Sequence, residues 1–212
     1  MNERLVWTME RPSKRRQSGN AMIEFALCMT LLIPLFLGSV VVGISLRRSV
    51  QVTQVSRDAG HMFARWVDFS QPANQDLIVR LAQGLNMTRT GGNGVVMLSK
   101  VMHIGTTECA AGGLTPAQCT NYNQSVIIQR IVIGSAGLRA SAFGTPSSDL
   151  LNAKGEVSNY LTETSARTAG FSNLLSLQTG ELAYISEAFF ALPALRFSNY
   201  RAIEGVYART FF

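Results

Sequence analysis

The stretch Gly19–Leu46, GNAMIEFALCMTLLIPLFLGSVVVGISL, decides how this chain is organised. From Phe25 to Leu46 it holds 22 residues without a charge, and an α-helix needs about 20 apolar residues to cross a bilayer. We therefore predict one membrane-spanning helix over residues 20–46, bent or partly unwound between Pro34 and Gly38. The competing interpretation is a secretory signal peptide. It would have an apolar core of roughly 7–15 residues followed by a small-residue cleavage site, which Gly43-Ile-Ser45 matches poorly.

A single acid, Glu24, stands just before the uncharged run, four residues after Asn20. The spacing puts the two residues on the same helix face, about one turn apart. An ionisable side chain at the edge of hydrocarbon is costly unless a partner neutralises it, and it marks a functional residue. We expect that partner to be an amine.

The basic leader Lys14-Arg15-Arg16, followed by Gly19 and Glu24, resembles the processing site of type IV pilins and pseudopilins. Within that superfamily it is most similar to the TadE-like minor pseudopilins of tight-adherence pili. The resemblance implies that a prepilin peptidase cuts after Gly19, that Asn20 becomes the first mature residue, and that Glu24 is the signature acid. Asn20 stands where most type IV pilins have Phe or Met, whereas Pro34 fits the Leu/Pro-rich run of the TadE-like group.

Cutting after Gly19 would create an α-amino group with a pKa of about 8 at the membrane edge. If neighbouring helices pack with a stagger of about one turn, the ammonium of one subunit can pair with Glu24 of the next and favour correct register. The alternative is that Glu24 only reaches into the headgroup zone and has no role in assembly.

The net charge of +6 on 212 residues is concentrated in the leader. Five of the 19 basic residues lie in residues 1–19, and residues 20–212 hold fourteen basic and eleven acidic side chains, a balance of +3. By the positive-inside rule the leader stays in the cytoplasm and the rest is exported, although Arg47 and Arg48 weaken the asymmetry. We expect a single-pass protein of the bacterial inner membrane with a periplasmic C-terminal domain, and no nucleic-acid partner.

Beyond the membrane, one helix face stays apolar. Its apolar residues are spaced 3, 4, 3, 4 and 3 apart: Val52, Val55, Ala59, Met62, Trp66 and Phe69. This spacing predicts that the helix continues to about Trp66 or Phe69 and buries the stripe against the chain's own outer domain. After Pro72, a second helix is predicted over Asn74–Leu85, with Leu77, Ile78, Leu81, Ala82 and Leu85 turned inward.

Two β-rich runs, Val95–Ile104 and Ser125–Ile133, are predicted to be antiparallel neighbours. Strand character returns in Glu181–Leu192 and, after a turn at Pro193, in Arg201–Phe212. The TadE-like resemblance implies that this closing pair completes a sheet against the long helix. Residues 134–172 are predicted to form a surface excursion with a short helix near Glu156–Thr164.

These predictions combine into an α+β fold with the lollipop layout of pilins. The expected parts are a cleaved leader (1–19), a transmembrane helix (20–46), its periplasmic continuation (47–69) and a periplasmic α+β domain (70–212).

The three cysteines divide by compartment. Cys28 lies within the membrane run, whereas Cys109 and Cys119 lie in a segment that should form an exposed loop in an oxidising compartment. We predict a disulfide between Cys109 and Cys119, worth about 2–3 kcal/mol. The alternatives are two free thiols or, less favoured, a metal site, for which no further Cys or His pair lies nearby.

Catalytic motifs are missing from the sequence. His61 and His103 have no second ligand at metal spacing, and there is no HExxH, GxSxG, CxxC or phosphate loop. We therefore expect no enzyme and no cofactor. The function indicated is a minor pilin or pseudopilin, with other pilin subunits, the assembly machinery and a prepilin peptidase as partners. The alternative is a permanently anchored periplasmic binding or scaffold domain.

Overall fold

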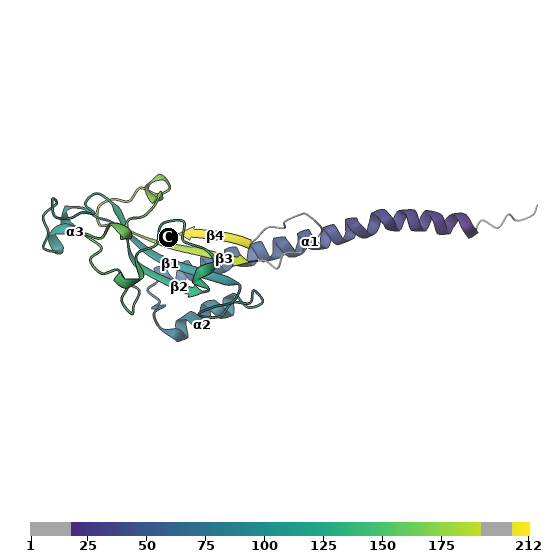
Figure 1. Ribbon diagram of the computed structural model, residues 1–212, viewed down its shortest axis with the longest axis horizontal. Helices are drawn as coiled ribbons and strands as arrows, with labels where there is room; N and C mark the ends of the chain where they lie inside the picture. Colours follow the sequence, from purple (N-terminus) through teal and green to yellow (C-terminus); the bar gives the residue numbers. More distant parts are fainter. Residues whose placement is uncertain (1–17, 192–204) are drawn as a thin grey trace, which may run out of the picture. The chain divides into compact units, whose positions relative to one another are not determined.

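Residues 18–191 and 205–212 are described by a computed structural model (Figure 1). The basic leader over residues 1–17 and the turn predicted at Pro193 lie outside these described residues. The chain divides into two compact units, residues 1–45 and residues 46–212.

Helix α1 (Ser18–Ala64) is 47 residues long. From Ala21 to Leu46 its side chains are almost all apolar and exposed, because nothing in this unit packs on them. The backbone stays helical through Pro34 and Gly38, so the unwinding predicted between them is wrong. Proline removes only one intrahelical hydrogen bond, and the long apolar helix tolerates that loss.

Helix α1 ends two residues before the earlier of the two predicted ends. The amide of Val67 donates to the carbonyl of Met62 and the amide of Trp66 to that of Phe63, each at 3.1 Å. This pair of hydrogen bonds is the Schellman motif, which places one residue in the left-handed region. That residue is Trp66, with φ of 67°. Because the backbone changes direction at Trp66, its side chain points into solvent and is 75% exposed. The prediction that Trp66 belongs to the buried stripe is therefore wrong.

Four antiparallel strands form one sheet with the order β2-β1-β3-β4. Strands β1 (Gly94–His103) and β2 (Ser125–Gly134) pair directly, with a register shift between Lys100 and Val101. Strand β3 (Leu182–Ala191) lies beside β1, and β4 (Gly205–Phe211) closes the sheet. The first two predicted strands, their antiparallel pairing and the closing pair are therefore confirmed.

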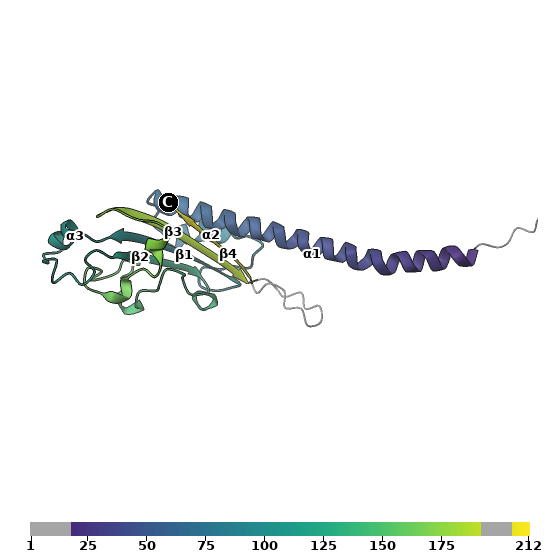
Figure 2. The ribbon, with the colours of Figure 1, turned by 90° about the horizontal axis from the view of Figure 1, so that it is seen from above.

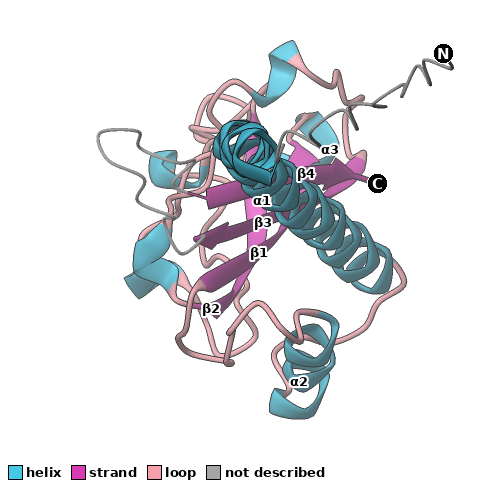
Figure 3. Ribbon diagram, turned by 90° about the vertical axis from the view of Figure 1, so that its right-hand side faces the viewer, coloured by secondary structure: helices cyan, strands magenta, loops and turns pink. Residues whose placement is uncertain are grey.

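The second half of α1 and helix α2 (Pro72–Leu81) cover one face of this sheet (Figures 2 and 3). Val52, Val55, Ala59 and Phe63 of α1 belong to the same buried cluster as side chains of all four strands. Each fully buried Val, Ile or Phe contributes about 1.5–3 kcal/mol, so this contact secures the helix. The amphipathic stripe is thus buried within the chain's own domain, as the spacing predicted.

Helix α2 is shorter than predicted and buries fewer residues. Ile78, Ala82 and Leu85 are buried, but Leu77 and Leu81 are 40% and 37% exposed. The helix stops at Leu81, and Gly84 takes a positive φ of 88°. Because the chain turns there, only one face of α2 packs on the core, and Leu77 and Leu81 stay partly exposed.

The other face of the sheet is covered by residues 104–124, which include the short helix α3 (Thr106–Ala111), and by the largely irregular residues 135–181. Phe143, Val157, Leu161 and Phe171 pack there with Ile185 and other strand residues in a second buried cluster. Most of residues 134–172 lie on the surface, as predicted, but the segment also supplies five buried side chains to this cluster: Phe143, Val157, Leu161, Ala166 and Phe171. The helix predicted near Glu156–Thr164 is absent, and turns and isolated bridges, such as Gln129 with Glu156, stand in its place.

Candidate functional site

The carboxylate of Glu24 lies two turns into α1 and is the only charge between Ala21 and Leu46. Its own side chain is exposed, and its neighbours Met22, Phe25 and Leu27 are 78%, 63% and 68% exposed. An 18-residue window of this helix reaches a mean hydropathy of 2.5 with none of it buried, so the helix is long and apolar enough to cross a membrane. Such a helix indicates membrane anchoring.

The hydroxyls of Thr30 and Ser39 in this segment are satisfied locally, whereas the carboxylate of Glu24 is not. Thr30 Oγ1 donates to the carbonyl of Ala26 and Ser39 Oγ to that of Phe36, both at 2.8 Å. These bonds hide the hydroxyls inside the helix's own backbone. The one ion pair among the described residues joins Arg89 to Asp76 at 3.3 Å. A counter-ion for Glu24 is therefore not found among the described residues of the same chain.

Gly19 and Asn20, the predicted cleavage position, lie in the first turn of α1. Cleavage between them, and pairing of the new amine with Glu24, stay predictions. Glu24 follows Asn20 by four residues on a continuous helix, so the two lie about 6 Å apart along the axis.

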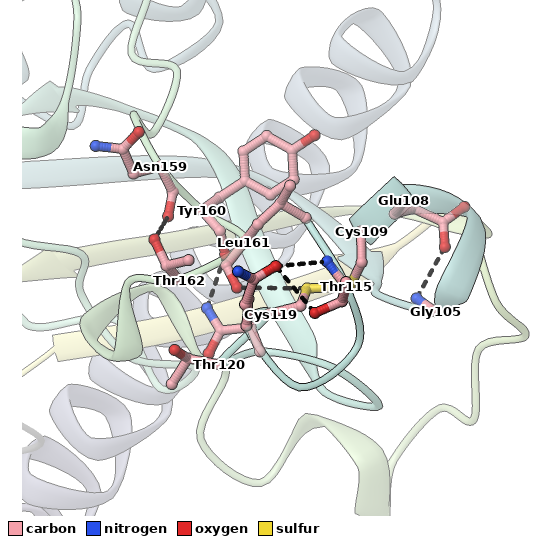
Figure 4. The surroundings of a disulfide bond; sticks show 12 residues. Gly105, Glu108, Cys109, Thr115, Cys119, Thr120, Asn159, Tyr160, Leu161 and Thr162 are labelled. Carbon is pink, nitrogen blue, oxygen red and sulfur yellow. Dashed lines mark hydrogen bonds between the residues drawn. A yellow bond between two sulfur atoms is a disulfide. The ribbon is translucent and has the colours of Figure 1, made fainter. Parts of the chain in front are cut away.

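The predicted cysteine pair forms a disulfide between helix α3 (Thr106–Ala111) and the turn that follows it (Figure 4). The sulfurs of Cys109 and Cys119 are 2.04 Å apart. Thr115 starts the turn, and both its amide and its hydroxyl donate to Gln118 Oε1. The disulfide closes a loop of ten residues, which limits the unfolded chain and stabilises the fold by about 2–3 kcal/mol.

Most residues between the two cysteines are exposed, as predicted, but the cysteine side chains themselves are buried. Cys109 and Cys119 are 0% and 2% exposed and belong to the cluster on the far face of the sheet. The carbonyl of Leu161 accepts from the amide of Asn121 at 3.0 Å and lies 3.7 Å from Cys119 Sγ. The disulfide thus holds part of the irregular layer together, and we find in it no binding or catalytic geometry.

A buried carboxylate that the sequence reasoning missed, Glu187, lies on the far face of β3 and is 0% exposed. It accepts hydrogen bonds from the hydroxyl of Ser141, from the amide of Ala142 at 2.8 Å and from Tyr207 Oη at 2.7 Å. The available signal was a charge inside an otherwise apolar strand, ELAYISEAFF. Alternation alone would have placed that charge in solvent.

Arg130 on β2 is 3% exposed, and the negative charge of Glu187 acts on its guanidinium. Burial lowers the pKa of its guanidinium to about 10, while Glu187 acts in the opposite direction. Arg130 Nη2 donates to the carbonyl of Gly144 at 2.7 Å, whereas its Nε has no partner among the described residues. Together the two side chains anchor residues 141–144 to the sheet.

Three hydroxyls, those of Ser56, Ser186 and Thr210, lie between α1 and the sheet. Ser56 Oγ donates to the carbonyl of Ser186 at 3.1 Å and lies 3.2 Å from Thr210 Oγ1. Ser56 is fully buried, and these contacts fulfil its hydrogen-bonding capacity. The site therefore positions the helix on β3 and β4.

The two histidines lie apart from one another and from any ligand set. His61 packs on the ring of Phe212 at 4.4 Å between centroids, and His103 contacts Ser125 Oγ and Asn123 Oδ1 at 3.2 and 3.3 Å. Within the part of the chain that the structure describes, no three His, Cys, Asp or Glu side chains are grouped to hold a metal ion.

Comparison with known proteins locates the family signal in α1. Residues 19–61 match the family model described as TadE-like protein, which confirms the resemblance carried by the glycine, the acid and the apolar run. The match starts at the predicted cleavage glycine and ends at His61, directly before the residues of the Schellman motif. The search of curated proteins and the search of solved structures gave no match.

Proposed function

We propose that this chain is a minor pilin or pseudopilin of a Tad-type pilus, cut by a prepilin peptidase after Gly19. The family match over its N-terminal helix supports a pilus-associated, structural role. The observation that carries the finer proposal is Glu24, a lone carboxylate without a described partner on a helix of exposed apolar side chains.

Cleavage would supply the missing counter-ion. The new ammonium of Asn20 on one subunit would meet Glu24 of a neighbouring subunit when the two helices are offset by about one turn. At 4 Å and an effective dielectric constant of 20, two unit charges attract by about 4 kcal/mol before desolvation is counted. Part of this energy is enough to distinguish the correct register from its neighbours.

The remaining apolar surface of α1 gives the helix two successive environments. In the membrane its side chains contact lipid, and in a filament they contact the helices of other subunits. Gly38 and Gly43 have no protein atom near the position that a Cβ would occupy, so close approach of another helix is sterically open there.

The proposed topology keeps the basic leader in the cytoplasm and the sheet domain in the periplasm. The buried disulfide between Cys109 and Cys119 supports this assignment, because disulfides persist in the oxidising periplasm and are rare in the cytosol. The proposed partners are other pilin subunits, the inner-membrane assembly machinery and the prepilin peptidase.

The mature N-terminus tests this proposal. In membranes from cells that express the peptidase, mass spectrometry should find a chain that starts at Asn20. Gly19→Ala should remain uncut and heavier by nineteen residues, because a Cβ at the cleavage glycine hinders close backbone approach by the peptidase. Gly43→Ala, which alters the same helix where nothing lies nearby, should be cut normally. A wild-type chain that starts at Met1 would instead support a permanently anchored periplasmic scaffold.

A further inference from the structure

Trp66 is a large aromatic side chain in an unfavourable place. It is 75% exposed and takes the left-handed conformation that Gly or Asn normally occupies after a helix. A bulky residue there is strained, and an exposed indole gives up most of the apolar burial that it could gain. Strain and exposed aromatic surface together point to a use outside the folding of the chain.

The indole is held in position by its neighbours. Lys100 Nζ lies 4.7 Å from its ring centroid, and the ring of Tyr184 meets it edge to face at 6.3 Å. Tyr184 in turn packs against buried Phe63 at 5.4 Å. Through Tyr184 and Phe63, Trp66 is therefore held against the cluster that lies between α1 and the sheet. Most of the indole surface nevertheless stays exposed.

Two adjacent hollows lie in the surface beside Trp66 and Tyr184. One, of about 230 Å³, is lined by Trp66, Tyr184, Asp68 and Lys154, among others. The second, of about 280 Å³, adds Asn152 and Tyr160. Lys100, Gln129 and Glu156 line both hollows, so the two are adjacent and form one elongated depression.

The polar lining is balanced in charge. Lys100 and Lys154 provide two cations, and Asp68 and Glu156 provide two anions. Neither ammonium donates a hydrogen bond among the described residues, so both remain available as donors. The carboxylates keep acceptor sites, although Asp68 Oδ1 already accepts from Ser70 and Glu156 Oε2 from Asn152 Nδ2. Asn152 Oδ1 already accepts from two backbone amides and Gln129 Nε2 donates to the carbonyl of Lys154, so each amide keeps only part of its hydrogen-bonding capacity for a ligand. Such a lining selects against an ion of either sign and favours a neutral ligand with many hydroxyl groups.

We propose that this depression binds a neutral saccharide, with the apolar face of a sugar ring stacked on Trp66 and its hydroxyls bonded to the charged and amide groups. A protein partner fits less well, because Trp66 is the one largely exposed apolar side chain that lines either hollow. Protein interfaces have apolar centres, which this surface lacks. The inference uses the outer domain alone and does not depend on the proposed pilin function.

Binding can be tested by fluorescence, because Trp7 and Trp66 are the only tryptophans. In the full chain with Trp7→Phe, Trp66 is the sole tryptophan. The protein is kept in a phosphocholine detergent, since a glycosidic detergent would compete for the site. Cellobiose, maltose and chitobiose are added in turn. We expect at least one of them to change the emission saturably, with a dissociation constant of about 1 mM or below.

Two variants separate binding from folding. Glu156→Gln, in the Trp7→Phe chain, should weaken binding at least about fivefold, whereas Asp149→Asn, an exposed acid that lines neither hollow, should leave it unchanged. Trp66→Asn relieves the left-handed strain, so its thermal midpoint should not fall, yet calorimetry should detect no binding. The proposal is overturned if none of the three sugars binds up to about 50 mM, or if Trp66→Asn binds as the wild type does. It is also overturned if Trp66 emission shifts with protein concentration in the absence of sugar, since a second copy would then cover this surface.

Discussion

Glu187 shows how one buried side chain can organise a layer that has no regular structure. Its carboxylate holds Ser141 and Ala142, and Arg130 holds Gly144, so a short segment is fastened to the sheet at both ends. Phe143, between these contacts, packs against Phe171 at 5.9 Å and Phe211 at 5.6 Å. The polar contacts therefore set where this part of the apolar cluster lies.

Replacing Glu187 should distinguish its hydrogen bonds from its charge. Glu187→Leu leaves the Ala142 amide, the Tyr207 hydroxyl and the Arg130 charge without an acceptor or counter-charge, and should cost about 3–5 kcal/mol. Glu187→Gln can keep most of the hydrogen bonds and should cost about 1–2 kcal/mol. Asp149→Asn, an exposed acid, is the matched control. Denaturant unfolding followed by circular dichroism measures all three, and equal stability of the Leu variant and the wild type would contradict this role.

Tyr207 makes the stability of the domain depend on alkaline pH. Its pKa is raised above the ordinary value of 10.0, first by desolvation and then by the hydrogen bond and charge of Glu187. Because the folded-state pKa is raised, the stabilisation is complete below pH 10 and is lost as the pH rises above it. Tyr207→Phe should be less stable than the wild type by about 1–2 kcal/mol at pH 7.

That difference should stay constant to about pH 9 and shrink above pH 10, by less than about 1.4 kcal/mol per pH unit because Tyr207 is partly exposed and screened. Unfolding curves of both proteins between pH 7 and 11 measure it. A difference that grows with pH would show that the assigned sign is wrong.

Helix α1 joins two kinds of surface in one element. Before Leu46 it is apolar all round, and from Val52 onward it carries a single buried stripe. Gly60 lies in that stripe, where an added Cβ would collide with the ring of Phe212 and come within 3.0 Å of Ser186 Cβ. The absence of a side chain at Gly60 is what allows helix and sheet to approach this closely.

Gly60→Leu should therefore destabilise the domain by about 1–3 kcal/mol, although leucine favours helix formation more than glycine does. Gly43→Leu, in the same helix with no atom near its Cβ position, should leave the unfolding of the domain unchanged. Thermal unfolding of the detergent-solubilised chains compares the two. Equal midpoints for both variants would mean that Phe212 moves aside without cost.

At the scale of the whole molecule, Glu24 separates insertion from assembly. Glu24→Gln removes a charge from the hydrocarbon edge, so insertion should not suffer. The variant should be cut after Gly19 and yet accumulate in the inner membrane, because the proposed pairing with the ammonium of Asn20 would be lost. Glu24→Asp, which keeps the charge on a shorter side chain, should retain part of the assembly. Immunoblots of sheared filaments and of membranes measure the distribution, and wild-type amounts of the Gln variant in filaments would reduce Glu24 to an interfacial residue.

Features that depend on residues close together in the chain could be predicted from the amino-acid sequence alone. The apolar run, the 3-and-4 spacing after Val52 and the β-rich runs each follow from residues a few positions apart. The apolar membrane-spanning segment, the amphipathic half of α1 and the strands of the sheet could therefore be predicted. The pairing of Cys109 with Cys119 was accessible for the same reason, since the two cysteines are ten residues apart.

The features that could not be predicted depend on residues far apart in the chain, so they became visible only in the folded structure. Trp66 continued the helical stripe in spacing, but the hydrogen bonds that end α1 reversed its direction. Residues 134–172 lacked periodicity, yet Phe143 and Phe171 became buried because β1, β2 and β3 offered them an apolar face. Glu187 became a buried anchor only when Ser141, Ala142 and Tyr207, between 20 and 46 residues away, supplied its hydrogen bonds. Periodicity records which face of an element is apolar, and only the assembled fold determines what covers that face.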